Sequence, residues 1–296
     1  MGLDQHGGSD REEQLRFFRI LAATLLLLHP ATALAQTVWD MPTEYPQSAM
    51  PGLGITTFAK RLSELSAEKL QIKASFDAST GIRSAGMLAA IAEGRVQAGD
   101  ALAGALEAED AIFALPTLLY LTPWPPSGIW SKAPLKAPSD LSGLSIRTYD
   151  KISSEVFASV GAKATTISFA DTMSKLVDGS INAVLSSGDG GAGRKLWEYL
   201  PYFTEITYSL PLSVASVSQA VYDGLDQDLR QAVDAAGRQT EVELWLALST
   251  RLQENYRRMR QNGVTIDSSP APAMMAALQG GAAAAQQAWC ARSGPV

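Results

Sequence analysis

The stretch "LSGLSIRTYD", residues 141–150, is the point from which the fold can be worked out. Its Leu144-Ser145-Ile146 segment has the pattern of a short strand, and Arg147 follows at the end of that segment. No acidic residue precedes Asp150 within the stretch, so Arg147 has no local partner. A guanidinium group presents a planar fork that matches a carboxylate through two parallel hydrogen bonds. Arg147 is therefore either a surface charge or a carboxylate-binding group in a cleft.

Strand-like and helix-like segments alternate on both sides of this stretch. The expected strands are 37–42, 71–77, 117–124, 163–169 and 181–187, and the expected helices are 54–70, 150–162, 170–180, 191–201 and 226–263, with a helix and a turn in 82–100. Ser153 or Ser154 is expected to cap the helix of 150–162, and 226–263 is either one long helix or a broken pair. This order predicts an α/β fold with a mainly parallel sheet. Two such units predict two lobes with a ligand-binding cleft between them.

The composition is that of an ordinary globular protein. The chain has 296 residues, of which 46% are hydrophobic and 18% are charged, which is enough for one large or two small domains. Its net charge is −6 and its basic residues form no cluster. The sequence therefore lacks the electrostatic footprint of a nucleic-acid-binding protein.

The first 35 residues have the pattern of a secretory signal peptide. Arg16 and Arg19 precede the apolar run Ile20–Leu28, and Ala33-Leu34-Ala35 fits the small-residue rule for cleavage. A membrane anchor fits less well, because the run has about half of the roughly 20 residues that span a bilayer. We therefore expect residues 1–35 to be removed and the mature chain, from Gln36, to be a soluble exported protein.

The inventory of reactive side chains excludes most catalytic chemistry. His6 and His29 are the only histidines, and both lie in the expected signal peptide. Without histidine, the mature chain has no Ser-His-Asp triad, Cys-His dyad or histidine zinc site. Cys290 is the only cysteine, so no disulfide forms within the chain. Carboxylate-only catalysis stays open, but no pair of carboxylates stands out, and we expect neither a cofactor nor a metal ion.

The glycine-rich segment "SSGDGGAGRK" resembles a nucleotide-binding turn. Gly188, Gly190 and Gly193 have GxGxxG spacing after a strand and before a helix. The segment lies in the middle of an exported chain and lacks the Gly-Lys-Ser/Thr of a P-loop, so we do not expect a nucleotide. Two interpretations stay open. The N–H groups of the helix start bind an anion, or the glycines only permit a tight turn.

The order of several motifs resembles one family, the solute receptors of tripartite ATP-independent periplasmic (TRAP) transporters, of the DctP type. The motifs are "YPQSAMPGLGITTFAKRLSELS" (45–66), "VQAGD" (96–100), "SKAPLKAPSDLSGLSIRTYD" (131–150) and "SSEVFASVGAKATTISFADTMSKLVDGSINAV" (153–184). "PWPPSGIWSK" (123–132) and "SSGDGGAGRKLWEYL" (186–200) are similar to one branch of that family. The resemblance covers nearly the whole mature chain.

The resemblance implies a binding protein rather than an enzyme. In this family two α/β lobes are joined by strands and by a long helix that crosses both, and the lobes close over a small organic acid. The loaded receptor then docks on a TRAP membrane permease. The implied division is a signal peptide (1–35), lobe I with part of the C-terminal helices (36–118), lobe II (119–223), and a connecting helix with the C-terminal segment (224–296). Between 109–116 and 118–126 the family usually carries a further helix, which is missing here.

The resemblance also assigns the ligand site. The arginine that holds the ligand carboxylate in this family falls on Arg147. A frequent asparagine falls on Ser186, and a second arginine of some members falls near Ser127, which is neutral. One cation suits a monocarboxylate better than a dicarboxylate. Positions near strand ends add further ligand-binding candidates, which are Trp124, Tyr149, Tyr45, Ser187 and Gly188. Each aromatic is otherwise interpreted as a core residue.

Two other functions stay open. A periplasmic protein of the same fold can act as the ligand-sensing partner of a membrane kinase instead of supplying a permease. An exported enzyme that uses carboxylates is less consistent with the residues, because the one well-placed functional group is an arginine.

Overall fold

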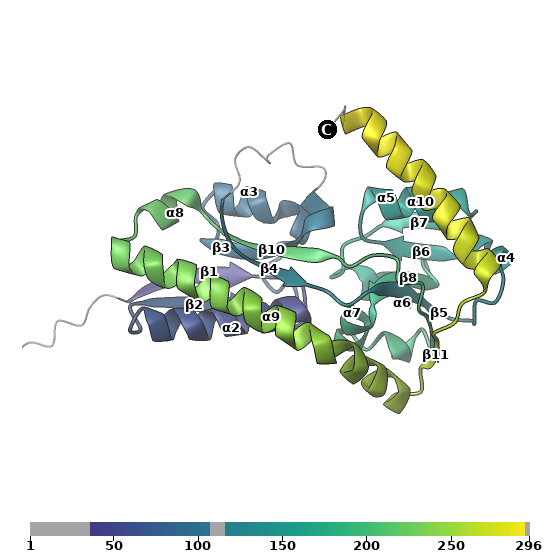
Figure 1. The fold of residues 1–296 in the computed structure, drawn as a ribbon, viewed down its shortest axis with the longest axis horizontal. Helices are drawn as coiled ribbons and strands as arrows, with labels where there is room; N and C mark the ends of the chain where they lie inside the picture. Colours follow the sequence, from purple (N-terminus) through teal and green to yellow (C-terminus); the bar gives the residue numbers. More distant parts are fainter. Residues whose placement is uncertain (1–35, 107–115, 294–296) are drawn as a thin grey trace, which may run out of the picture. The chain divides into compact units, whose positions relative to one another are not determined.

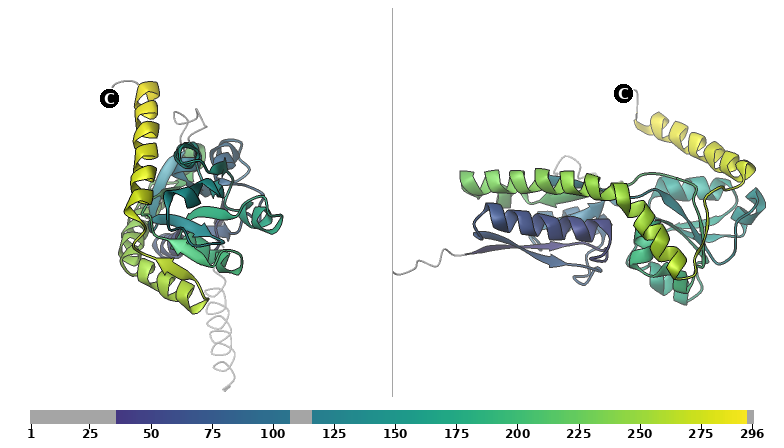
Figure 2. Two further views of the ribbon diagram at one scale, coloured as in Figure 1. Left: turned by 90° about the vertical axis from the view of Figure 1, so that its right-hand side faces the viewer. Right: turned by 60° about the horizontal axis from the view of Figure 1, so that its bottom comes forward.

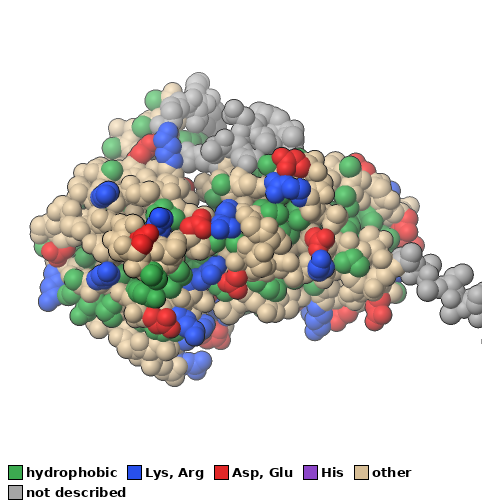
Figure 3. Space-filling model, turned by 180° about the vertical axis from the view of Figure 1, so that it is seen from behind, with side chains coloured by type: hydrophobic (Ala, Val, Ile, Leu, Met, Phe, Trp, Pro, Cys, Tyr) green, Lys and Arg blue, Asp and Glu red, His purple; other side chains and the backbone are tan. Residues whose placement is uncertain are grey.

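A computed structural model describes residues 36–106 and 116–293 of the chain (Figure 1). The expected signal peptide (1–35) and residues 107–115, next to the expected missing helix, lie outside the described residues. Within the described ranges, no helix is both long enough and apolar enough to cross a bilayer. On the face that Figure 3 shows, acidic and basic side chains are interspersed, which leaves that face without a strong field of either sign.

Short strands and helices alternate along most of the chain, and two long helices end it (Figure 1). The first elements are β1 (Thr37–Pro42), α2 (Met50–Leu65), β2 (Leu70–Ser75), η1 (Ser84–Gly86), α3 (Met87–Ala92), β3 (Ala98–Leu102), η2 (Ala103–Leu106) and β4 (Thr117–Pro123). The next are β5 (Ser127–Ser131), α4 (Pro138–Ser142), β6 (Ser145–Thr148), α5 (Lys151–Ser159), β7 (Lys163–Thr166), α6 (Thr172–Val177), β8 (Ala183–Ser187) and α7 (Gly188–Gly193). The last are η4 (Leu196–Glu198), β9 (Tyr202–Thr204), β10 (Leu212–Val217), α8 (Gln219–Asp223), α9 (Gln227–Gln261), β11 (Thr265–Asp267) and α10 (Pro272–Ser293).

The first lobe contains two small sheets. β1 and β2 form a parallel pair, and β10 lies between β3 and β4 and is antiparallel to both. The helix α2 packs on β2 and on α9. Pro51 sits in the first turn of α2, where a missing N–H costs nothing. Ile55, Phe58 and Leu62 recur at helical spacing and are fully buried in the core of this lobe.

The second lobe contains one sheet of six strands in the order β11-β9-β5-β8-β6-β7. β6 is parallel to β7 and β8, whereas β5 is antiparallel to β8 and β9. Five of the six strands run in the same direction and only β5 opposes them, so the prediction of a mainly parallel sheet is confirmed for this lobe. The three-stranded sheet of the first lobe is antiparallel instead, because β10 runs against both β3 and β4.

The strands of each lobe do not come from one continuous segment of the chain. Strands β4 and β10 both belong to the sheet of β3, so the segment 119–223 contributes strands to both lobes. The chain passes from the first lobe to the second after β4 and returns before β10. The connections 124–126 and 205–211 therefore join the lobes.

The helix α9 is continuous over 35 residues, so the alternative of a broken pair is wrong. Its first half buries Ala236 and Leu244 in the core of the first lobe, and its second half buries Tyr256 and Met259 in the second lobe (Figure 2). A Cβ on Gly237 would lie 2.3 Å from the Leu119 carbonyl oxygen, so only glycine permits this close approach to β4.

Two local features differ from the sequence-based expectations. Asp150, and neither Ser153 nor Ser154, caps α5, because its carboxylate accepts a hydrogen bond from the Ser153 N–H at 2.7 Å. The helix 191–201 is shorter and starts earlier than expected, as α7 followed by the 3₁₀ turn η4. Lys195, between these two elements, has a left-handed backbone with φ of 53°, which interrupts the helix.

Candidate functional site

The strand β6 places Arg147 at the edge where three parallel strands end. Arg147 lies opposite Thr165 on β7 and Val184 on β8. Only 3% of its surface is exposed, so the interpretation of Arg147 as a surface charge is wrong. The carboxyl ends of parallel strands are a common place for ligands, because loops and helix starts converge there.

Main-chain oxygen atoms hold the guanidinium of Arg147. Its Nε donates to the Ile167 carbonyl at 2.8 Å, and its Nη1 donates to the Leu185 carbonyl at 3.1 Å. Burial lowers the pKa of Arg147, but an arginine in a protein keeps its proton. None of the ion pairs within the described residues includes Arg147. The charge is thus oriented by neutral groups.

Aromatic rings surround the guanidinium. The centre of the Phe169 ring lies 5.4 Å from its Cζ, and that of Tyr149 lies 6.0 Å from it, within the range of a cation–π contact. Tyr45 packs on Phe169 with 5.3 Å between the ring centres and on Trp124 with 4.8 Å. These rings exclude water from one side of the charge, which strengthens electrostatic interactions there.

Hydroxyl groups fix two of these rings. The Tyr149 hydroxyl lies 2.6 Å from Ser209 Oγ, and Trp124 Nε1 donates to Ser213 Oγ at 3.0 Å. Burial raises the pKa of Tyr149 to about 12, so its hydroxyl stays neutral. Both serines belong to the chain that returns to the first lobe, so the rings are held at the junction of the lobes.

A cavity of about 30 Å³ adjoins Arg147. Seven of the eight ligand-binding residues expected from the sequence line it, which are Tyr45, Trp124, Ser127, Arg147, Tyr149, Ser186 and Ser187. Leu102, Phe169 and Pro211 complete its lining and were not expected. Phe169 is the last residue of the expected strand 163–169. That position at a strand end could have identified it as a ligand-binding candidate.

Gly188 lines none of the cavities described here. A Cβ on Gly188 would lie 3.1 Å from Met259 Sδ, so this glycine faces α9. The other glycines of the segment also permit close packing, because a Cβ on Gly191 would lie 2.2 Å from the Trp130 ring. The Gly190 N–H donates to Ser187 Oγ at 3.1 Å, which uses one free donor of the α7 start. These contacts are those of a tight turn.

A larger cavity, of about 580 Å³, shares Leu102, Arg147 and Tyr149 with the smaller one. Glu44 lines it and is 2% exposed. Its Oε1 accepts a hydrogen bond from Ser84 Oγ at 2.7 Å, and its Oε2 accepts one from the Ala170 N–H at 3.4 Å. A buried carboxylate thus faces the same space as the buried guanidinium. The sequence analysis missed Glu44, although it is the neighbour of Tyr45.

This arrangement suits the binding of a small polar molecule that carries a negative charge. Arg147 supplies the positive charge, and Ser127, Ser186 and Ser187 supply hydroxyl groups. Glu44 supplies an acceptor for an N–H or O–H group. Each carboxylate oxygen accepts more than one hydrogen bond, so the bonds from Ser84 and Ala170 leave acceptor capacity.

Solved structures with the same fold are extracytoplasmic solute receptors. DctP7 of Bordetella pertussis, a receptor binding pyroglutamic acid, is 26% identical, with a TM-score of 0.81 over 87% of this chain and 96% of that chain. DctP6 of the same organism, also described as binding pyroglutamic acid, is 26% identical, with a TM-score of 0.80 over 87% and 96%. A pyroglutamate-specific TRAP solute-binding protein from an unidentified marine microbe is 22% identical, with a TM-score of 0.79 over 88% and 95%.

The sequence itself matches a family model over residues 128–289, which is more than half of the chain. That stretch contains the strand end of Arg147 and the whole of the long helix α9. The family comprises solute-binding proteins, and the two-lobed fold expected from the resemblance is confirmed. The chain belongs to bacterial extracellular solute-binding protein family 7, the DctP family.

Proposed function

We propose that this protein binds a small monocarboxylate through Arg147 and delivers it to a TRAP membrane permease. The observation that supports this most strongly is the buried guanidinium, which is oriented by carbonyl oxygens and forms no ion pair among the described residues. A buried charge is costly unless it is compensated. A ligand carboxylate would compensate it with charge-assisted hydrogen bonds.

The charges around the two cavities support a ligand with one carboxylate. Among the described residues, Arg147 is the only cation that lines the smaller cavity. The larger cavity adds Lys151, whose side chain is 66% exposed and lies 3.9 Å from Glu155. A second ligand carboxylate would meet Glu44 instead of a second buried cation, and like charges in a buried site repel.

Glu44 further supports a ligand that carries an N–H group. A carboxylate accepts hydrogen bonds and donates none when it is ionised. The lactam of pyroglutamate has one carboxylate and one N–H, which match Arg147 and Glu44. The two Bordetella pertussis receptors that bind pyroglutamic acid make this acid the first probe. The proposed ligand class is therefore lactam and N-acyl amino acids.

Delivery to a permease follows from the family resemblance and is tested separately from binding. Uptake of radiolabelled acid into membrane vesicles that contain the TRAP permease should require added receptor. If the receptor binds acid but does not promote uptake, the delivery half of the proposal is wrong and a sensing role replaces it.

Binding is tested by isothermal titration calorimetry with pyroglutamate and a panel of other carboxylates. Arg147→Gln should abolish measurable binding, because truncating one partner of a buried charge pair costs about 2–5 kcal/mol. Arg95→Gln is the matched control, because Arg95 pairs with Glu93 at an exposed position. Melting curves establish that both variants fold. Unchanged affinity in folded Arg147→Gln would refute the assignment.

A further inference from the structure

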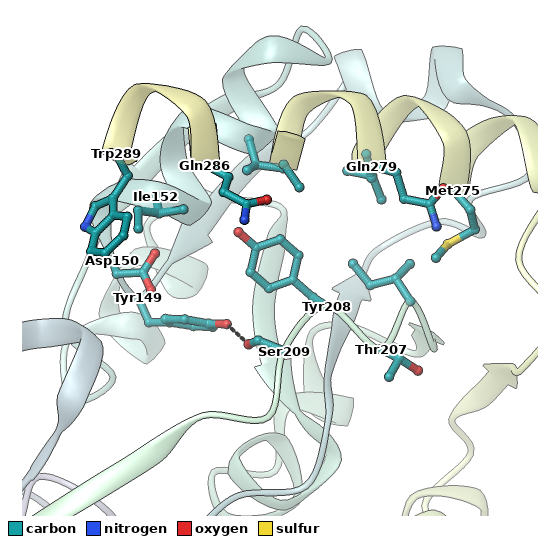
Figure 4. A pocket seen from close by; sticks show the side chains of 14 residues that line it. Tyr149, Asp150, Ile152, Thr207, Tyr208, Ser209, Met275, Gln279, Gln286 and Trp289 are labelled. Atoms are coloured by element: carbon teal, nitrogen blue, oxygen red, sulfur yellow. Dashed lines mark hydrogen bonds between the residues drawn. The ribbon is translucent and has the colours of Figure 1, made fainter. Parts of the chain in front are cut away.

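A separate cavity of about 470 Å³ lies under the C-terminal helix α10 (Figure 4). Its walls come from α10, from α5 and from residues 206–209, which belong to a connection between the lobes. It shares Tyr149 with the smaller Arg147 cavity, and Tyr149 and Asp150 with the larger one. Its volume is in the range of small-molecule sites, about 300–1,000 Å³.

Three aromatic rings face this cavity. Tyr149 and Tyr208 form a corner, with 6.4 Å between the ring centres and 73° between the ring planes. Figure 4 shows Trp289, from the last turns of α10, on the side of the cavity where Asp150 and Tyr149 lie. Trp289 is 43% exposed, so its ring is accessible to a ligand. Rings placed around a space in this way attract a cation to their faces.

The charge on the cavity wall is negative. Asp150 is the only charged side chain among the described lining residues, and no lysine or arginine is among them. Asp150 Oδ1 caps α5 through the Ser153 N–H, whereas Oδ2 accepts no hydrogen bond from a described residue. Figure 4 shows this carboxylate next to the Tyr149 ring. One carboxylate oxygen is thus available beside the aromatic corner.

The rest of the wall is largely apolar. Val156 from α5, Ile206 from the connection and Leu278 from α10 line it, together with the amides of Gln279 and Gln286. An ammonium group alone would fill only part of about 470 Å³. The wall therefore fits a molecule with an apolar body as well as a positive head.

We infer that this cavity binds an organic ammonium ion with an apolar body, at a site separate from the one that receives the acid. The head lies against Tyr149, Tyr208 and Trp289 and is neutralised by Asp150. The body lies against Val156 and Leu278. The inference does not depend on the identity of the acid.

The test measures binding of choline by calorimetry. The control is 3,3-dimethyl-1-butanol (dimethylbutanol), in which carbon replaces the nitrogen of choline. Choline should bind at least about fivefold more tightly than dimethylbutanol, because only the charged head gains cation–π and carboxylate contacts. Hexyltrimethylammonium should bind more tightly than choline, because its chain covers the apolar wall. Equal binding of choline and dimethylbutanol, or no binding of either ammonium ion, would overturn the inference.

Variants locate the site. Trp289→Leu keeps an apolar side chain but removes the ring, and should weaken choline binding about fivefold or more. Trp245→Leu is the matched control, because Trp245 is 50% exposed on α9 and does not line the cavity. Asp150→Asn keeps a helix cap and removes the charge, so it should also weaken choline binding.

Unchanged choline affinity in both Trp289→Leu and Asp150→Asn would place choline elsewhere. Choline binding should survive in Arg147→Gln, and its loss there would place choline in the acid site.

Discussion

The carboxylate of Asp189, in α7 of the second lobe, accepts a hydrogen bond at 2.7 Å from the N–H of Met50, which begins α2 in the first lobe. The same carboxylate accepts bonds from Arg251 Nε at 2.5 Å and from Asn255 Nδ2 at 3.0 Å, both on α9. Asp189 is 1% exposed. One buried acid therefore ties the start of α2 and the long helix to the glycine-rich turn.

Asp189→Ala should destabilise the protein strongly. It leaves the Arg251 charge and the Met50 N–H without their partner, and breaking a buried ion pair in this way costs roughly 3–5 kcal/mol. Urea unfolding measures the loss. Asp40→Ala is the control, because the Asp40–Lys73 pair is exposed and should contribute at most about 1 kcal/mol. Equal losses in the two variants would contradict the role of Asp189 as a junction.

Asp100 should make stability depend on pH. It is fully buried on β3, Thr43 Oγ1 donates to its Oδ1 at 3.1 Å, and its Oδ2 has no hydrogen-bond partner among the described residues. Burial raises the pKa of Asp100 from 3.8 to about 7. Between these values the folded protein holds a proton that the unfolded chain has lost. The contribution of protonated Asp100 to the free energy of unfolding is therefore complete below about pH 4. It is lost as the pH rises to about 7.

The replacement Asp100→Asn removes this proton and should flatten the pH dependence. The free energy of unfolding of the unmodified protein, relative to that of the variant, should fall by a few kcal/mol from pH 4 to pH 8, because each pKa unit corresponds to about 1.4 kcal/mol. Urea unfolding at several pH values measures both curves. Parallel curves would show that Asp100 does not titrate in this range.

Glu44→Gln should change which acids bind. The amide side chain keeps the size of Glu44, but it loses the charge that accepts a ligand N–H. Affinity for pyroglutamate should fall roughly tenfold or more, because a hydrogen bond to a charged group contributes about 1.5–3 kcal/mol. Cyclopentanecarboxylate lacks the N–H, so its affinity should not fall. Calorimetry with both acids separates the effects, and parallel losses would mean that Glu44 acts on the fold of the site instead.

Acid and ammonium ion should bind cooperatively if both proposed sites are occupied. Tyr149 lines both sites, and the charge of Arg147 repels a cation on the other side of this shared residue. A bound carboxylate neutralises that charge. Choline should therefore bind roughly twofold to tenfold more tightly when pyroglutamate is present, and added salt should reduce the effect. The coupling is reciprocal, so the same factor should appear when pyroglutamate is titrated into the choline complex. Weaker choline binding in the presence of acid would contradict it.

The structure places seven of the eight expected ligand-binding residues around one cavity. Most expected ligand-binding residues follow the ends of strands, and neighbouring strand ends meet in space whatever the exact order of the sheet. Tyr45, Arg147 and Ser186 therefore line one cavity although they are far apart in the chain. Glu44 and Phe169 were missed because their places in the site depend on contacts between distant segments, such as Glu44 with Ala170 and Phe169 with Tyr45.

The direction of β10 was not readable in the same way. β10 has the apolar pattern of any buried strand, and only its partners β3 and β4 make it antiparallel. The spacing of Gly188, Gly190 and Gly193 was equally ambiguous. Their role depends on Met259 and Pro46, which lie beside Gly188 and Gly193 only in the folded chain.

Gly237, in the first third of α9, lets the helix lie close to the first lobe. At Gly237 the helix touches the backbone of β4, and near its other end Met259 is fully buried in the second lobe. Between these anchors Trp245 and Leu246 are exposed and form no part of either core. The part of α9 that crosses from one lobe to the other is thus exposed. If one lobe rotates against the other, we expect α9 to bend over that exposed stretch.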